Sequence, residues 1–290
     1  MENATPADPV ETVDPITTTT APKPKNEWVD LGWFLLKLVI VVVVLRSFIF
    51  SPFSIPSESM LPRLLVGDYL FVSKFSYGYS KHSLPLSLPL IPNMHWSDPT
   101  RGDVVVFKAP GHNGEDWIKR VIGLPGDTIQ VQGGQLILNG QKIPKAPIAD
   151  FVLPVSPNSS CNPQFQDMDD KGKAICRTPR FRETLPSGKT YEVLDEGNRP
   201  QDDTGVFTVP AGHVFLMGDN RDNSTDSRFQ APSDDATAEE RGRAGIGFVP
   251  IENIEGKAVV NFWSTDGSAS WILPWTWFTA ARWSRIGAGF

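Results

Sequence analysis

Two serines that could act as nucleophiles, Ser57 and Ser59, lie between Pro56 and Pro62. The prolines remove backbone donors and restrict the neighbouring dihedrals, so a helix cannot run through this stretch. A stiff, extended segment with small hydroxyl residues can present a nucleophile to a substrate. A Ser/Pro linker between two parts of a chain has the same composition, and the stretch taken alone favours the linker.

A serine nucleophile needs a base, and the chain offers two kinds. Of four histidines only His213, which precedes an Asp-rich loop, could complete a triad, and no Gly-x-Ser-x-Gly motif occurs. Lys119 alternates with Trp117 and Val121 on one face of an expected strand. Burial there would lower the lysine pKa, and a neutral amine can take a proton from serine. Alternatively, the stem packs on the strand and the ammonium reaches solvent.

The loop Gly218–Arg228 contains three aspartates and two arginines. A calcium loop counted from the second aspartate would need Gly and Glu where this chain has Ser227 and Ser233, so we expect no metal there. An Asp–Arg network that stiffens the loop is more natural, because arginine binds carboxylates bidentately. A stiff loop could also use Ser224 or Thr225 to orient a base.

The elements that must position these groups begin with an apolar run from Trp28 to Phe50. A helix of about 20 residues crosses the hydrocarbon core, and Lys37 and Arg46 can reach the headgroups from near its ends. No good signal-peptide cleavage site follows closely. We therefore expect one transmembrane helix over 28–50 that stays as an anchor. The charges on its two sides are too evenly divided to predict its orientation.

The rest of the chain is typical of a mainly β body, because 24 Gly and 26 Pro favour turns. The dipeptide Asn139-Gly140 predicts a two-residue hairpin. Residues 144–205 are polar and irregular with weak strand signals, which indicates an insertion or a small second domain. Alternation predicts strands at 67–74 and 117–122, and we also expect strands at 104–107, 128–131, 136–138, 212–217 and 258–263.

The composition of the chain bears on its partners and on its two cysteines. The net charge is −6 and no basic block occurs, so we expect no nucleic-acid partner. Cys161 and Cys176 would be incidental thiols in the cytosol but could form a disulfide outside it. A disulfide that closes a loop near 15 residues stabilises a fold by about 3 kcal/mol.

The two ends of the chain also have distinct compositions. Residues 1–26 contain five prolines and few large apolar side chains, which predicts a disordered tail. The C-terminal end is rich in indoles, which favour the membrane–water interface, although packing of an irregular tail explains them equally well. These indoles belong to Trp271, Trp275, Trp277 and Trp283.

Three stretches together resemble bacterial signal peptidase I: 56–60 (PSESM), 119–127 (KRVIGLPGD) and 218–228 (GDNRDNSTDSR). They occur in the right order after an N-terminal anchor, and 101–107 (RGDVVVF) also fits. The match covers roughly residues 45–265, and the last motif matches over its whole length.

The resemblance implies a role for each matching residue. Ser59 would be the nucleophile, Lys119 the general base, and Ser224 would bond to the lysine amine and orient it. The Ser59 N–H and the Ser57 hydroxyl would form the oxyanion hole. Met60 would pack beside the nucleophile.

The resemblance also implies ion pairs and a disulfide. Asp226 would pair with Arg228, and Asp219 with Arg221, to brace the loop. Cys161 and Cys176 would form a disulfide in an oxidising compartment.

The fold implied is mainly β: an antiparallel, barrel-like catalytic domain with a smaller β insertion, anchored by one N-terminal transmembrane helix. The expected parts are a disordered cytoplasmic tail (1–27), the helix (28–50), the catalytic domain in two parts (51–143 and 213–265), the insertion (144–212) and a Trp-rich membrane-interface segment (266–290).

The activity implied is removal of signal peptides from exported preproteins, after a small-x-small motif, by a membrane-bound serine endopeptidase with no cofactor. Its partners would be those signal peptides, the phospholipid membrane and the export machinery. It would lie in the cytoplasmic (inner) membrane with its catalytic domain on the outer, periplasmic face. Relatives can have two spans, and the resemblance gives no account of Glu58 beside the nucleophile.

Two rival functions remain. A self-cleaving Ser–Lys peptidase of the repressor type would use the same chemistry, but the membrane span and the hairpin-rich insertion argue against it. A catalytically idle, membrane-tethered β-domain that binds polypeptides would leave Ser59 as a linker residue and Lys119 extended to solvent.

Overall fold

A computed structural model describes residues 27–80, 93–270 and 272–290 of the chain. The chain forms two units, Met1–Val41 and Val42–Phe290. The first holds most of one long helix, and the second holds the β-strands.

The helix α1 (Glu27–Phe48) includes the only residue of the expected tail that lies within the described residues. Among those residues, α1 is the one helix long and apolar enough to cross a membrane. The span expected over 28–50 ends two residues beyond α1, because Phe50 begins the strand β1 (Phe50–Ser54). Pro52 lacks the N–H that a continuing helix would use.

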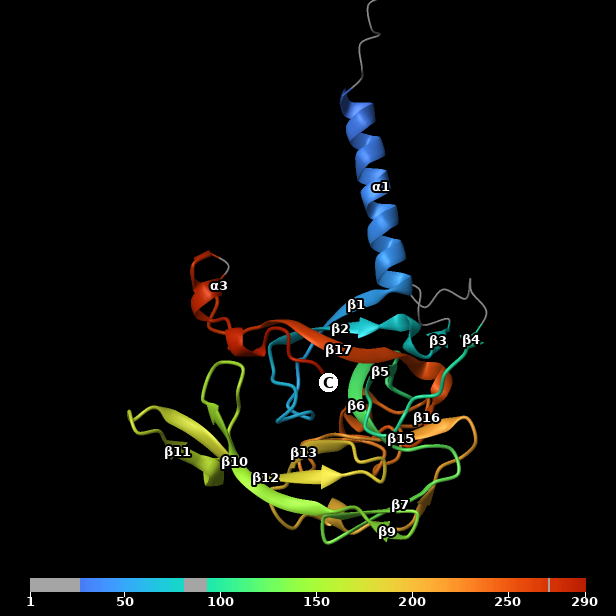
Figure 1. Ribbon diagram of the computed structural model, residues 1–290, viewed down its shortest axis with the longest axis vertical. Helices are drawn as coiled ribbons and strands as arrows, with labels where there is room; N and C mark the ends of the chain where they lie inside the picture. The colour runs from blue at the N-terminus through green and yellow to red at the C-terminus, as the bar shows by residue number, and fades with distance from the viewer. Residues whose placement is uncertain (1–26, 81–92, 271) are drawn as a thin grey trace, which may run out of the picture. The chain divides into compact units, whose positions relative to one another are not determined.

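A seven-stranded antiparallel sheet forms the centre of the second unit (Figure 1). Its strand order is β1-β2-β17-β5-β6-β15-β16, so the chain's first and last long strands lie near each other. The edge position of β1 suits Pro52, because no further strand needs its missing donor. The remaining strands are β2 (Asp68–Ser73), β5 (Val104–Lys108), β6 (Asp116–Gly123), β15 (His213–Met217), β16 (Val249–Pro250) and β17 (Ile254–Ser264).

A second sheet has the order β14-β7-β8-β9. The predicted hairpin joins β8 to β9, and Asn139 and Gly140 both have positive φ (52° and 76°), as a two-residue hairpin turn requires. The sheet comprises β7 (Thr128–Gln132), β8 (Gln135–Leu138), β9 (Gln141–Lys142) and β14 (Phe207–Thr208). A further two-stranded sheet pairs β3 (Gly78–Tyr79) with β4 (Met94–His95).

The segment expected to be irregular instead forms a third sheet with two long strands. Its strands are β10 (Lys145–Pro154), β11 (Gln166–Met168), β12 (Ala174–Thr184) and β13 (Thr190–Leu194). Strand β12 pairs with the other three, and its register with β10 shifts between Ile148 and Phe151. The fold is therefore mainly β and antiparallel with one N-terminal apolar helix, as the sequence predicts, but the insertion is more regular than expected.

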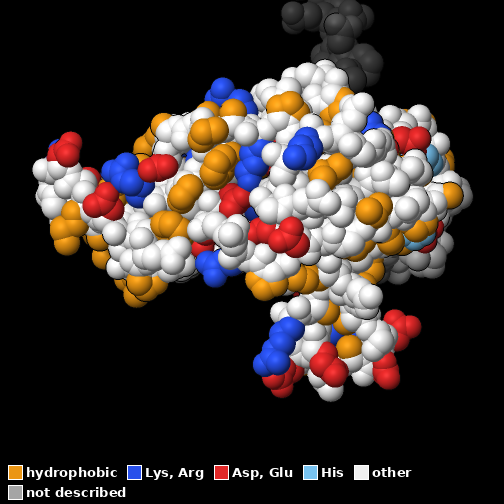
Figure 2. All heavy atoms as spheres, turned by 90° about the horizontal axis from the view of Figure 1, so that it is seen from below, with side chains coloured by type: hydrophobic (Ala, Val, Ile, Leu, Met, Phe, Trp, Pro, Cys, Tyr) orange, Lys and Arg blue, Asp and Glu red, His pale blue; other side chains and the backbone are white. Residues whose placement is uncertain are grey.

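The remaining elements are short. They are the helices α2 (Ala238–Arg243) and α3 (Thr276–Thr279) and the 3-10 turns η1 (Lys74–Ser76), η4 (Pro163–Phe165), η5 (Pro200–Asp202), η6 (Ile251–Asn253) and η7 (Trp283–Arg285). On the face drawn in Figure 2, acidic and basic side chains are interspersed rather than gathered by sign.

Candidate active site

The candidate nucleophile Ser59 lies in the segment that joins β1 to β2. Ile55 N donates to Asp68 O (2.9 Å) and Gly67 N donates to Ile55 O (3.0 Å), so the two ends of this segment are fastened together. Ser59 is 8% exposed, and Met60 is completely buried in one apolar cluster with Ile55. The Ser/Pro stretch is therefore a packed loop of the β body and not a free linker.

Lys119 reaches this loop from β6. Its Nζ donates to Ser59 Oγ at 2.8 Å and to the Ile118 carbonyl at 3.2 Å, and its side chain is 4% exposed. Burial lowers the pKa of Lys119 to about 8, against the opposing attraction of Asp226 and Asp219. The amine does not extend to solvent, and a large part of it is neutral near pH 8.

The described histidines do not meet Ser59. His213 bonds through Nδ1 to the Ala211 carbonyl, His112 bonds through Nε2 to the Gly245 carbonyl, and His95 pairs with an aspartate three residues on. The Asp-rich loop that follows β15 therefore approaches Ser59 without bringing His213 with it. The geometry supports the lysine as base over the histidine triad.

The possible oxyanion donors lie beside the nucleophile. Ser57 Oγ lies 3.4 Å from Ser59 Oγ, and the Ser57 side chain is exposed. Among the described residues, the Ser59 N–H makes no hydrogen bond. The Ser59 carbonyl, in contrast, accepts from Asn220 N at 3.1 Å, which holds the peptide in place. Both the hydroxyl and the N–H are thus available to an incoming oxyanion.

Ser224 does not make the predicted hydrogen bond to Lys119. Its Oγ is buried and has no hydrogen-bond partner among the described residues, while the donors of Lys119 go to Ser59 and Ile118. Ser224 still lies at the site, because a Cβ added to Gly218 would be 2.3 Å from Ser224 Oγ and 2.5 Å from the Ser59 carbonyl. Gly218 thus allows the loop after β15 to approach the nucleophile.

One of the two predicted ion pairs is present. Arg228 donates to Asp226 at 2.9 Å, and its second nitrogen donates to the Arg221 carbonyl at 2.6 Å. Burial by itself would raise the pKa of Asp226, but Arg228 and the backbone N–H of Gly218 outweigh burial, so the pKa is lowered. The carboxylate is charged and fastens the two ends of the loop.

The predicted pair Asp219–Arg221 is wrong. Asp219 pairs with Arg120 of β6 at 2.5 Å, and Arg221 pairs with Glu183 of β12 at 2.6 Å. All four side chains are buried, and the cost of taking these charges out of water is offset only by a well-placed, hydrogen-bonded partner of opposite charge. The loop is therefore tied to the catalytic sheet by one pair and to the inserted sheet by the other.

Sequence reasoning missed three residues that hold the segment between β1 and β2 (residues 55–67), which is the nucleophile loop. Asn220 Nδ2 donates to the Glu58 carbonyl at 3.2 Å, and Asn223 Nδ2 donates to the Glu58 carboxylate at 3.2 Å. The carboxylate also accepts from Ser160 N and Ser160 Oγ. The position of Glu58 between two serines was the only signal, and a sequence does not show which distant donors a side chain meets.

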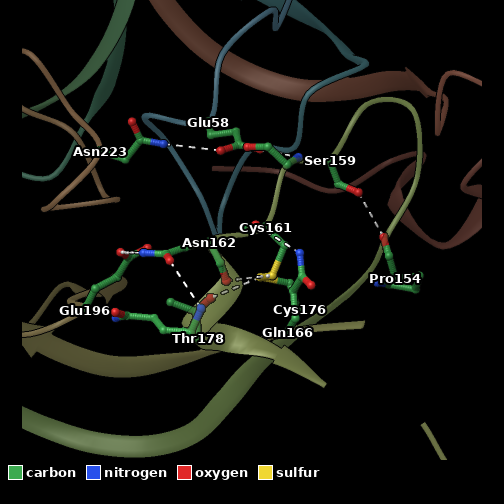
Figure 3. The surroundings of a disulfide bond; sticks show 12 residues. Glu58, Pro154, Ser159, Cys161, Asn162, Gln166, Cys176, Thr178, Glu196 and Asn223 are labelled. Atoms are coloured by element: carbon green, nitrogen blue, oxygen red, sulfur yellow. Dashed lines mark hydrogen bonds between the residues drawn. A yellow bond between two sulfur atoms is a disulfide. The ribbon is translucent and has the colours of Figure 1, made fainter. Parts of the chain in front are cut away.

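A disulfide joins Cys161 to Cys176 near this loop (Figure 3). Beside it is a cavity of about 440 Å³, lined by side chains of the nucleophile loop, the inserted sheet and the loop after β15. Glu58, Leu153, Leu194 and Asp222 are among them. Burial raises the pKa of Asp222 to about 6, and Asp195, Asp202 and Glu196 add to the rise.

Several known proteins resemble this chain in sequence. The sequence model of the family described as "Signal peptidase, peptidase S26" matches residues 27–263. The chain is 34% identical over 268 residues to a signal peptidase I of Rickettsia typhi (86% of this chain, 89% of that one). It is 32% identical over 281 residues to the signal peptidase I of Rickettsia akari (90% and 91%). The crystal structure of a signal peptidase I from Enterococcus faecalis V583 is 24% identical and covers 56% of this chain and 97% of that one, with a TM-score of 0.27.

Proposed function

Because this chain belongs to the signal peptidase family of peptidase S26, we propose that it removes signal peptides from exported preproteins with Ser59 as nucleophile and Lys119 as general base. The observation that carries the assignment of residues is the 2.8 Å hydrogen bond from Lys119 Nζ to Ser59 Oγ. A base must lie within hydrogen-bond reach of the proton that it takes.

In the first step the neutral amine of Lys119 takes the Ser59 hydroxyl proton while Oγ attacks the scissile carbonyl. The Ser59 N–H and the Ser57 hydroxyl donate to the oxyanion that forms. The lysine then gives its proton to the departing amine, which is the new N-terminus of the mature protein. Water, deprotonated by the same amine, hydrolyses the acyl-enzyme and releases the signal peptide.

Small residues at the first and third positions before the bond fit the wall beside Ser59. Ile55, Met60 and Ile118 belong to one buried apolar cluster at this loop, so we expect little room for a substrate side chain beside Ser59. Large side chains would need that cluster to move, which costs packing energy.

The helix α1 is proposed to anchor the enzyme as a single span in the inner membrane, with the β body on the periplasmic face near the export machinery. The Cys161–Cys176 disulfide supports this side, because disulfides persist in oxidising compartments. Protease added to spheroplasts should therefore digest the β body, whereas a body on the cytoplasmic side would be protected.

The test of the proposed function is cleavage of a preprotein in detergent by four enzymes: wild type, Ser59→Ala, Lys119→Ala and His213→Ala. The first two substitutions should abolish cleavage and the third should spare it. If Lys119→Ala remains active and His213→Ala does not, the base is misassigned.

The competing function is a tethered β-domain that binds polypeptides without cutting them. A fluorogenic peptide with Ala-x-Ala before the scissile bond separates the two, because a binding domain leaves it intact. Metal chelators and histidine-directed reagents should have little effect on the protease.

A further inference from the structure

The Glu58 carboxylate accepts three hydrogen bonds from two distant parts of the chain, and Figure 3 shows the one from Asn223. One carboxylate oxygen accepts from Ser160 N at 2.9 Å and from Ser160 Oγ at 2.8 Å. The other accepts from Asn223 Nδ2 at 3.2 Å. Ser160 belongs to the insertion and Asn223 to the loop after β15. The carboxylate therefore connects both to the nucleophile loop.

The connection to the insertion is itself anchored. Ser160 immediately precedes Cys161, and the disulfide joins Cys161 to Cys176 in the middle of the inserted sheet. Cys176 pairs with residues of both neighbouring strands, so its position is fixed by the ladder. Without the disulfide, the 155–165 connection would be held only at its two ends by β10 and β11, and Ser160 would lose the cross-link to β12 beside it.

The position of Glu58 gives these contacts a consequence for catalysis. Glu58 lies between Ser57 and Ser59, so its backbone is continuous with both proposed oxyanion donors. The carbonyl of Glu58 is held by Leu61 N and by Asn220 Nδ2, which fixes one end of the residue. The hydrogen bonds to the carboxylate fix the side-chain end of the residue.

We propose that Glu58 is a positioning residue that couples the insertion, through Ser160 and the Cys161–Cys176 disulfide, to the geometry of the nucleophile and oxyanion hole. This inference rests on the proposed function of Ser59. On this proposal, the insertion affects the rate of the chemical step through Glu58.

The first test is the steady-state kinetics of Glu58→Ala on the Ala-x-Ala peptide. We expect kcat to fall about tenfold while KM changes less than about twofold, because misplacing a reacting group affects the transition state. The melting temperature and the inflection of the pH–rate profile should stay unchanged. Asp167→Ala is the control, because this carboxylate pairs with Arg177 within the inserted sheet, and its kcat should stay near that of the wild type.

A reversal of donor and acceptor tests the contact to Asn223. Glu58→Gln keeps an oxygen for Ser160 but presents an amide N–H₂ group to the N–H₂ group of Asn223, so kcat should fall. Adding Asn223→Asp restores a donor–acceptor pair, and kcat should recover to within about threefold of the wild type. Failure of the double variant to recover, with both proteins folded, would overturn the role given to this contact.

A redox experiment tests the link through Ser160. Dithiothreitol reduces the disulfide to two thiols and is itself oxidised to its cyclic disulfide. Reduction should lower kcat several-fold in the wild type and have no further effect in Glu58→Ala, because the coupling is already lost there. If reduction leaves wild-type kcat unchanged, or lowers both enzymes equally, the coupling does not exist. If the wild type does not cut the peptide, or if Ser59→Ala still cuts it, the proposed function fails instead.

Discussion

At the scale of single residues, the proposed mechanism makes the activity depend on the protonation of Lys119, whose pKa is lowered to about 8 by burial. The base must be neutral, so kcat/KM should rise about tenfold per pH unit below that pKa and level off above it. A pH–rate profile on the soluble peptide measures this. A flat profile across pH 6 to 10, roughly the range over which the amine titrates, would contradict the assignment of Lys119 as base.

The same burial opposes folding. An unfolded lysine has a pKa near 10.4, so between about pH 8 and pH 10.4 the folded state binds fewer protons and this group's contribution to stability rises with pH. Lys119→Met removes the amine. Urea unfolding near neutral pH should show a gain of about 1–3 kcal/mol together with lost cleavage, and the gain should shrink near pH 10. An equal gain at both pH values would mean that the charge is not its source.

Gly218 is the second residue whose replacement has a specific expected result. An alanine there would place its Cβ 2.5 Å from the Ser59 carbonyl, so the nucleophile loop or the loop after β15 must move. We expect kcat to fall by about a hundredfold. Gly205→Ala is the control, because a Cβ there meets nothing within 4 Å. Near-normal kcat in Gly218→Ala would show that the two loops separate without affecting the site.

The sequence predicted which residues form the site better than it predicted the partners of those residues. Ser59 and Lys119 are brought together as the sequence motifs suggest, because alternation in β6 places Lys119 on an apolar face. The partners of Asp219 and Arg221 could not be predicted, since they come from other strands. A charge pattern within one loop shows that partners are needed, but not where in the fold they lie.

At the scale of elements, the pair between Arg221 and Glu183 joins the loop after β15 to the inserted sheet. Glu183→Ala would leave a buried guanidinium unpaired, and we expect stability to fall by about 3–5 kcal/mol. Glu192→Ala is the control, since its arginine partners are partly exposed and such pairs contribute roughly 0–1 kcal/mol. Urea unfolding of both variants measures the difference. Equal losses of stability in the two variants would show that burial does not increase the contribution of the Arg221–Glu183 pair.

Element prediction succeeded where the burial pattern is simple. The strands β5 to β8 and the Asn139-Gly140 hairpin were predicted from alternation or continuous apolar runs. Strand β1 was missed because Phe50 looks like the end of the apolar helix. Strands β10 and β12 were missed because their exposed and half-buried residues do not alternate, and a register shift interrupts their pairing.

At the scale of the whole molecule, we predict that the C-terminal segment contacts the membrane interface. The exposed fractions of Trp275 and Trp277 are 64% and 40%, and Trp277 also lines an apolar cavity of about 570 Å³ with Tyr69 and Phe262. Indoles favour the headgroup layer. Replacing both tryptophans with alanine should lower kcat/KM a few-fold for a preprotein in lipid vesicles and leave the soluble peptide unaffected.

Met168→Ala is the control for that prediction, because Met168 is 69% exposed in the inserted sheet. Equal effects of the double tryptophan variant on both substrates would indicate damage to the fold rather than lost membrane contact.

The burial of Lys119 has a consequence for the life of the protein before it is assembled. In a nascent chain at pH 7.4 only about one lysine amine in a thousand is neutral. Ser59 and Lys119 are separated by 60 positions, and β17 and β5 lie between β2 and β6 in the sheet, so the two residues meet only once β17, the last long strand, has joined. On the proposed mechanism, the polypeptide is therefore inactive during synthesis and becomes a protease only when its central sheet is complete.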